Sequence, residues 1–426
     1  MKRKLFFFTK KYCTAENIRT FVLVLLAIVV LVEKYESPFT LIKKMGNSEL
    51  IASLLIIVAC TVIVRIVSYI VAYFTEDAAK VDPDPKHIMK TYPLCEMLVE
   101  DGDKYPINML WVKENPGQKI EYKIEDHPNA FYKLPTQIDK HFSEIINSAH
   151  KISNTYNQIN IRLNDFDFEP NTNTITLNTE RTMYYDLLVT NRAMDIIWDN
   201  GFSVRNLYEP GPFLSDLKDS RLANHIGYNG IVETSDGMIV MVYRNAHVST
   251  DKNQYKFSIS GSLKARHVLD SKSHTITSIN QFCNAVTHEI IDELNIDLEA
   301  FPNAKDKISF TKDDIIAFYR DMCEGGKPHF LFYKKIDFTM KQIDAGLQRI
   351  SRGKNKDFTV DGKRFIWLTH EEFVNSKVGD ADKKGKVNLL AGRKSLVMNC
   401  NNAGLTLVVR DYVGKLKNRT SPGVKS

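Results

Sequence analysis

HEIIDELNI, residues 288–296, brings three carboxylates close together: Glu289, Asp292 and Glu293. Residues three and four apart share one face of a helix, so the three side chains fall within an arc of about 100°. Carboxylates that close repel one another unless a cation or a basic group lies among them. The stretch therefore predicts either a site for a divalent cation or an acidic helix face turned to solvent.

The residues around this stretch predict a mixed α/β domain. Apolar side chains recur at helical spacing over residues 278–294. Before this helix, residues 227–245 resemble two strands around Asp236-Gly237, a strong hairpin signal, and another strand at 255–260 ends at Gly261. After it, we expect strands in HFLFYKKIDF (329–338), in KRFIWLTHEEF (363–373) and at 404–412.

The segment upstream of the hairpin combines short strands and helices. WVKENPGQKIEYKI (111–124) contains two strand-like pieces around an Asn-Pro-Gly turn, and residues 137–158 have helical spacing. A short strand at 174–177 precedes a helix over 182–198. We therefore divide the 426 residues into a membrane hairpin (1–75), a connecting region (76–173), the α/β domain (174–415) and a basic tail (416–426).

Two apolar runs near the N-terminus predict two transmembrane helices. The first covers residues 18–35 around FVLVLLAIVVLV, and the second covers 50–74 around LIASLLIIVACTVIV. A bilayer core needs roughly 20 mostly apolar helical residues. A signal peptide is the alternative for the first run, but no small-residue cleavage site follows it. Arg65 falls within the second run, where it either reaches the headgroups or faces the interior of an oligomer.

Basic residues set the expected orientation. The tail before the first run carries Lys2, Arg3, Lys4, Lys10 and Lys11. This excess predicts that the N-terminus stays in the cytoplasm, and two crossings return the C-terminal part to the same side. We thus expect an inner-membrane protein with both termini cytoplasmic and the lipid bilayer as a partner. The net charge of +6 is too mild to argue for a nucleic acid polymer.

The 288–296 stretch resembles the end of a Nudix box, in which Arg-Glu-x-x-Glu-Glu-x-Gly closes a catalytic helix. The Arg position is His288 and the closing Gly is Asn295, while the early Glu and first Gly are Asn280 and His274. The resemblance implies that any metal would be Mg²⁺ or Mn²⁺, held by Glu289, Asp292 and Glu293, which would clamp a pyrophosphate. Because the supporting residues have changed, the chain is expected to bind rather than hydrolyse.

The order of motifs further resembles the Nudix-domain effectors that accompany cyclic-oligonucleotide synthases in bacterial anti-phage (CBASS) systems. The resemblance covers about residues 175–412 and rests on five stretches. They are RTMYYDLLVTNRAMD (181–195), YNGIVETSDGMIVMVYRN (228–245), SISGSL (258–263), HEIIDELNI (288–296) and FYRDMCEGGKPHFLFYKK (318–335).

The resemblance implies an effector that senses a cyclic oligonucleotide, assembles into a homo-oligomer and disrupts the membrane, giving abortive infection. Candidate ligand-binding residues are Arg244, Gly261, Lys264, Arg266 and Lys327, since arginine and lysine pair with phosphate oxygens. Each basic residue has the alternative of a solvated surface charge. Two other functions stay open: a membrane-tethered, Mg²⁺- or Mn²⁺-dependent Nudix hydrolase of a nucleoside diphosphate-linked or cyclic nucleotide, and a scaffold for protein contacts.

Overall fold

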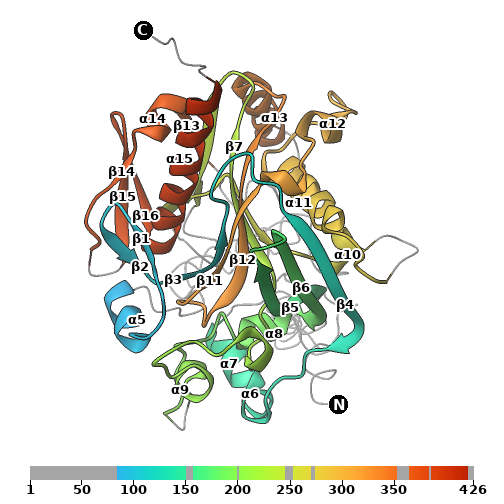
Figure 1. The fold of residues 1–426 in the computed structure, drawn as a ribbon, viewed down its shortest axis with the longest axis vertical. Helices are drawn as coiled ribbons and strands as arrows, with labels where there is room; N and C mark the ends of the chain where they lie inside the picture. Colours follow the sequence, from blue (N-terminus) through green and yellow to red (C-terminus); the bar gives the residue numbers. More distant parts are fainter. Residues whose placement is uncertain are drawn as a thin grey trace, which may run out of the picture. The chain divides into compact units, whose positions relative to one another are not determined.

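The computed structural model describes residues 84–149, 157–198, 201–244, 253–269, 274–352, 364–382 and 385–420. These residues belong to one compact unit of the chain, which comprises residues 78–150 and 156–426. The fold is mixed α/β with several sheets (Figure 1).

An eight-stranded sheet forms the centre of this unit. Its main path is β13-β8-β7-β12-β11-β3, with β10 paired to β7 and β9 paired to β8. The strands are β3 (Ile107–Val112), β7 (Gly227–Glu233), β8 (Met238–Arg244), β9 (Gln254–Lys256), β10 (Ile259–Ser262), β11 (Ile315–Asp321), β12 (Lys327–Lys335) and β13 (Arg364–Thr369). The central strands β7 and β12 run parallel and the other pairs are antiparallel. Every residue of β7 is buried, as expected for a strand covered on both faces.

Two hydrophobic cores cover the opposite faces of this sheet. The first contains the apolar side of α11 (Ile279–Glu293) and residues of a three-stranded sheet ordered β4-β6-β5, namely β4 (Glu121–Phe131), β6 (Thr174–Met183) and β5 (Ile159–Glu169). The second contains α15 (Cys400–Thr420) and a small sheet of β14 (Lys377–Val378), β15 (Lys386–Ala391) and β16 (Lys394–Asn399). Figure 1 shows α11 and α15 on the two sides of the central sheet.

The remaining elements are short and lie at the ends and edges of these layers. They are the hairpin β1 (Leu98–Glu100) and β2 (Asp103–Tyr105), the helices α5 (Pro85–Thr91), α6 (Thr136–Lys140), α7 (Phe142–Ala149), α8 (Tyr184–Val189), α9 (Val204–Tyr208), α10 (Ala265–Val268), α12 (Ala304–Ile308), α13 (Met340–Arg352) and α14 (His370–Val374), and the 3-10 turns η1 (Leu217–Asp219) and η2 (Lys312–Asp314).

Local signals place α11 where the sequence predicts it. Ser278 caps its start, and the side chain of Gln281 returns to the backbone of Ser278, which completes a capping box. After the helix, Asn295 adopts a left-handed conformation with φ 53°. Asparagine tolerates this conformation better than most other non-glycine residues. Asn295 can therefore end the helix in the left-handed conformation for which the Nudix pattern has a glycine.

The Asp236-Gly237 hairpin is confirmed. Gly237 has φ 76° and joins the antiparallel pair β7 and β8.

Three other predictions need correction. The predicted strand 404–412 is instead part of α15. Gly404 allows this helix to lie against the ring of Tyr105, because a Cβ there would approach that ring within 2.6 Å. The predicted helix over 182–198 is only α8, because β6 continues to Met183. The pieces at 111–124 belong to two different sheets rather than to one hairpin.

The prediction of two transmembrane helices is also corrected. Among the described residues, no helix is both long and apolar enough to cross a bilayer. Even the 21-residue α15 carries Arg410 and Asp411 near its middle. The two predicted spans, 18–35 and 50–74 with Arg65, lie outside the described residues. The supported fold class is mixed α/β with several sheets, and the expected inner-membrane location loses its structural basis.

Replacing Gly230 by alanine tests the packing of the parallel pair at the centre of the sheet. A Cβ at this position would lie 2.2 Å from the ring of Phe332, a fully buried side chain. We expect the substitution to lower the free energy of unfolding by about 1–3 kcal/mol, the usual cost of overpacking, in urea denaturation. Gly414→Ala is the matched control, since its nearest neighbour lies at 3.8 Å and helix propensity favours alanine. Equal effects of the two substitutions would contradict this packing.

Candidate functional site

The three carboxylates of α11 do not converge on one point. Glu289 is buried with 6% of its surface exposed, whereas Asp292 is exposed and Glu293 is half-buried. Within the described part of the chain, no group of three or more His, Cys, Asp or Glu side chains is placed to hold a metal ion. The predicted cation ligands Glu289, Asp292 and Glu293 therefore do not form a ready-made metal site.

A lysine supplies the positive charge that the Glu289 carboxylate requires. The ammonium of Lys264, in the turn between β10 and α10, lies 2.5 Å from the Glu289 carboxylate. His267 Nδ1 lies 3.5 Å from the same carboxylate oxygen. Burial by itself would raise the pKa of Glu289, but His267 and Lys264 outweigh it and lower that pKa to about 2. Glu289 is thus ionised and neutralised inside the protein, by a residue that the sequence assigned to ligand binding.

Gly261 has a packing role next to this ion pair. A Cβ at Gly261 would lie 2.4 Å from the hydroxyl of Tyr228, a fully buried side chain. Burial and the nearby carboxylate of Glu289 raise the pKa of Tyr228 well above its ordinary value, so the phenol stays protonated. Gly261 therefore makes room for a buried tyrosine beside α11.

Two of the other predicted ligand residues point elsewhere. Lys327 is buried with 1% of its surface exposed, and its ammonium lies 3.3 Å from the carboxylate of Glu324. Arg244 ends strand β8, where it pairs with Gln254 of β9. Neither residue lines the cavity that Arg266 borders.

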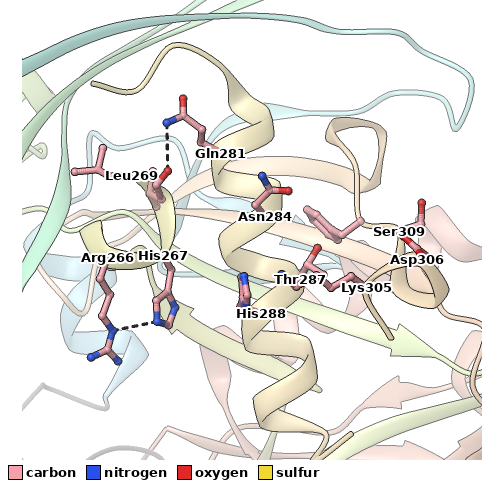
Figure 2. A pocket seen from close by; sticks show the side chains of 12 residues that line it. Arg266, His267, Leu269, Gln281, Asn284, Thr287, His288, Lys305, Asp306 and Ser309 are labelled. Carbon is pink, nitrogen blue, oxygen red and sulfur yellow. Dashed lines mark hydrogen bonds between the residues drawn. The ribbon is translucent and has the colours of Figure 1, made fainter. Parts of the chain in front are cut away.

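Arg266 lines a cavity with a volume of about 670 Å³, which the other predicted ligand residues do not line. The solvent-facing side of α11 forms its floor, and its walls come from α10 and from the α12 segment (Figure 2). Its polar lining is Arg266, His267, Gln281, Asn284, Thr287, His288, Lys305, Asp306 and Ser309, and its apolar lining is Val268, Leu269 and Phe310.

The charge of the cavity lining is net positive. The lining holds two cations, Arg266 and Lys305, but only one carboxylate, that of Asp306, and two imidazoles add further nitrogen atoms. Sequence reasoning missed His267, Lys305 and Asn284. The adjacent pair Arg266-His267 was a signal in the sequence, but Lys305 belongs to α12, a separate short helix that packs against α11.

The two histidines of the cavity lie close together. The ring centroids of His267 and His288 are 6.0 Å apart. Arg266 Nε donates a hydrogen bond of 3.0 Å to His267 Nε2. Burial, together with the nearby Lys305 and His267, lowers the pKa of His288 below its ordinary value. His288 is therefore neutral at pH 7, and it cannot replace the Nudix arginine as a fixed charge.

A buried ion pair anchors the loop before α11. Arg181 and Asp126 form two side-chain hydrogen bonds of 2.7 Å, and Arg181 also donates to the carbonyl of His274. The carboxylate of Asp126 additionally accepts from the backbone N–H of Ile276. Burial opposes ionisation of Asp126, but these contacts with Arg181 and Ile276 lower its pKa overall. The carbonyl of His274 thus accepts a hydrogen bond from Arg181, which fixes the segment that leads into α11.

Comparisons with known proteins add no family for this chain. No protein-family model matches it, and no curated protein matches its sequence.

Replacing Glu289 by glutamine tests the Lys264 ion pair. The variant leaves the half-buried Lys264 without its counter-charge, so we expect a loss of about 1.5–3 kcal/mol of unfolding free energy in urea denaturation at pH 7. Asp292→Asn is the matched control on the exposed side of the same helix, and its effect should stay within about 0.5 kcal/mol. The ion pair would have no stabilising role if the two variants unfolded alike.

The same pair predicts how stability depends on pH. The pKa of Glu289 falls from its ordinary value of 4.5 to about 2 on folding, so its contribution is complete above pH 4.5 and disappears as the pH falls toward 2. The difference in unfolding free energy between wild type and Glu289→Gln should therefore shrink over this interval. Urea titrations of both proteins at several pH values measure this difference. A difference that stays constant down to about pH 2 would contradict the claim that the buried carboxylate of Glu289 is ionised.

Proposed function

We propose that this chain is a sensor that binds a cyclic oligonucleotide in the cavity between α10, α11 and α12. One observation carries the proposal: Arg266 and Lys305 both line a cavity of about 670 Å³ beside the modified box. Pockets for small ligands typically have volumes of about 300–1,000 Å³. Arginine and lysine are the side chains that pair with phosphate oxygens.

The uncharged lining suits the remainder of a nucleotide. Leu269 and Phe310 offer apolar surface against which a base can pack. Asn284 is exposed on the floor of the cavity, and its amide can both donate to and accept from a base edge. The preference for a cyclic oligonucleotide over other nucleotides rests on the resemblance in motif order noted in the sequence.

The state of Glu289 favours binding over metal-dependent hydrolysis. A Nudix hydrolase uses its box carboxylates to hold a divalent cation that clamps the substrate. Here the carboxylate of Glu289 is paired with the ammonium of Lys264, so a cation would have to compete with a charge that the chain already supplies. Ligand-driven self-association stays a prediction of the sequence.

Charge reversal in the cavity tests the proposal. Isothermal titration of the full chain with cyclic 3′,5′-di-AMP, cyclic 3′,5′-di-GMP and cyclic tri-AMP should reveal binding of at least one. Each charge-assisted contact contributes about 1.5–3 kcal/mol, so Arg266→Glu combined with Lys305→Glu should weaken that binding at least 100-fold. Lys104→Glu, an exposed lysine of β2 that does not line the cavity, is the matched control.

Two results would contradict the sensor. Binding that is equally strong in the double variant would place the ligand elsewhere. Turnover of a nucleotide that requires Mg²⁺ or Mn²⁺ and disappears in Glu293→Gln would favour the hydrolase instead.

A further inference from the structure

The cavity lining contains one acidic side chain, to which the sensor function gives no role. Asp306 of α12 is exposed and lines the same cavity as Arg266 and Lys305. Within the described ranges of the chain, its carboxylate takes part in no hydrogen bond or ion pair. This carboxylate repels the phosphates that the two cations attract. A ligand that fills the cavity must therefore place a hydrogen-bond donor next to Asp306.

Contacts of the residues that follow Asp306 hold this wall of the cavity in place. Lys307 Nζ donates to the carboxylate of Asp337 at 2.8 Å and to the backbone carbonyl of the same residue at 3.1 Å. Lys334 Nζ donates to the backbone carbonyl of Ser309 at 2.7 Å, just after the end of α12. A group on an anchored element discriminates between ligands better than a group on a mobile one. The structure thus presents Asp306 on an anchored wall.

The base edges of guanine and adenine differ in how they fit a carboxylate. A carboxylate only accepts hydrogen bonds, and it does so through two neighbouring oxygens. The Watson–Crick edge of guanine carries two adjacent donors, N1–H and the 2-amino group, so each oxygen receives one hydrogen bond. The same edge of adenine carries a 6-amino donor beside the lone pair of N1, which a carboxylate oxygen repels. A ribose hydroxyl offers a single donor, so guanine is the nucleotide component that suits a carboxylate best.

We propose that the cavity selects a guanine-containing cyclic dinucleotide, with the carboxylate of Asp306 accepting from N1–H and from the 2-amino group of one guanine. The proposal rests on the sensor function and names the base that the sensor reads. Lys305, the preceding residue of α12, lines the same cavity and is suited to a phosphate of the same ligand.

Asn284 contacts the base without selecting it. Figure 2 shows Asn284 on α11 and Asp306 on the α12 side of the same cavity. The amide of Asn284 both donates and accepts, so it is able to meet either the 6-oxygen of guanine or the 6-amino group of adenine. The choice between the two bases therefore falls to Asp306.

Three cyclic dinucleotides that differ only in their bases test the selection. Isothermal titration of the full chain compares cyclic 3′,5′-di-GMP, di-IMP and di-AMP. Hypoxanthine, the base of di-IMP, keeps N1–H but lacks the 2-amino group. Because a bidentate base contact discriminates by about 10-fold or more, di-GMP should bind at least about 10-fold more tightly than di-AMP, with di-IMP between them.

Variants assign the selection to Asp306. Asp306→Asn replaces an acceptor by a donor, so it should weaken binding of di-GMP at least about 10-fold without weakening binding of di-AMP. Asn284→Ala should weaken binding of all three compounds alike. Asp103→Asn changes an exposed aspartate of β2 that does not line the cavity, and it should bind as the wild type does. Thermal unfolding shows that each variant is folded.

The possible results separate the guanine proposal from the sensor function. Binding of di-AMP or cyclic tri-AMP that is as tight as that of di-GMP would overturn the guanine proposal and leave the sensor intact. A preference for guanine that persists in Asp306→Asn would overturn the assigned role of Asp306. Failure of the chain to bind any of these compounds would remove the sensor function and the guanine proposal together.

Discussion

The ion pair between Lys264 and Glu289 is the constraint on which this site depends. It joins two residues that are 25 positions apart in the chain, one in the turn after β10 and one on the buried side of α11. Because the carboxylate of Glu289 is largely removed from water, it needs a nearby positive charge to remain ionised. The pair therefore ties α10 to α11 and uses, for this purpose, a carboxylate that a Nudix hydrolase would use to bind metal.

With Glu289 neutralised by Lys264, the side chains of α11 that are available to a ligand are those that border the cavity. The side of α11 that borders the cavity contributes Asn284, Thr287 and His288, and Arg266 and Lys305 line the same cavity. A site of this composition attracts anions, whereas a cluster of free carboxylates attracts cations. The side of α11 that borders the cavity is thus surrounded by more basic than acidic side chains.

Local signals in the sequence predicted much of the fold, and long-range contacts explain the rest. The start of α11 at Ser278 and the turn at Gly237 depend on a few neighbouring residues, so the local sequence was enough to predict both. The segment 404–412 was misread as a strand because its β-branched residues favour strands locally, while its contacts with the second core favour a helix. Of five predicted ligand residues only Arg266 lines the cavity, since Lys264, Lys327 and Gly261 are committed to internal contacts that spacing does not reveal.

The most direct test is whether the full chain binds a divalent cation at this helix. Electron paramagnetic resonance of Mn²⁺ distinguishes free from protein-bound ion. The account predicts the spectrum of free Mn²⁺ with the wild-type chain, because the carboxylate of Glu289 is already paired with Lys264. A bound, stoichiometric Mn²⁺ in the wild type that Glu289→Gln abolishes would contradict the claim that Lys264 stands in place of the metal.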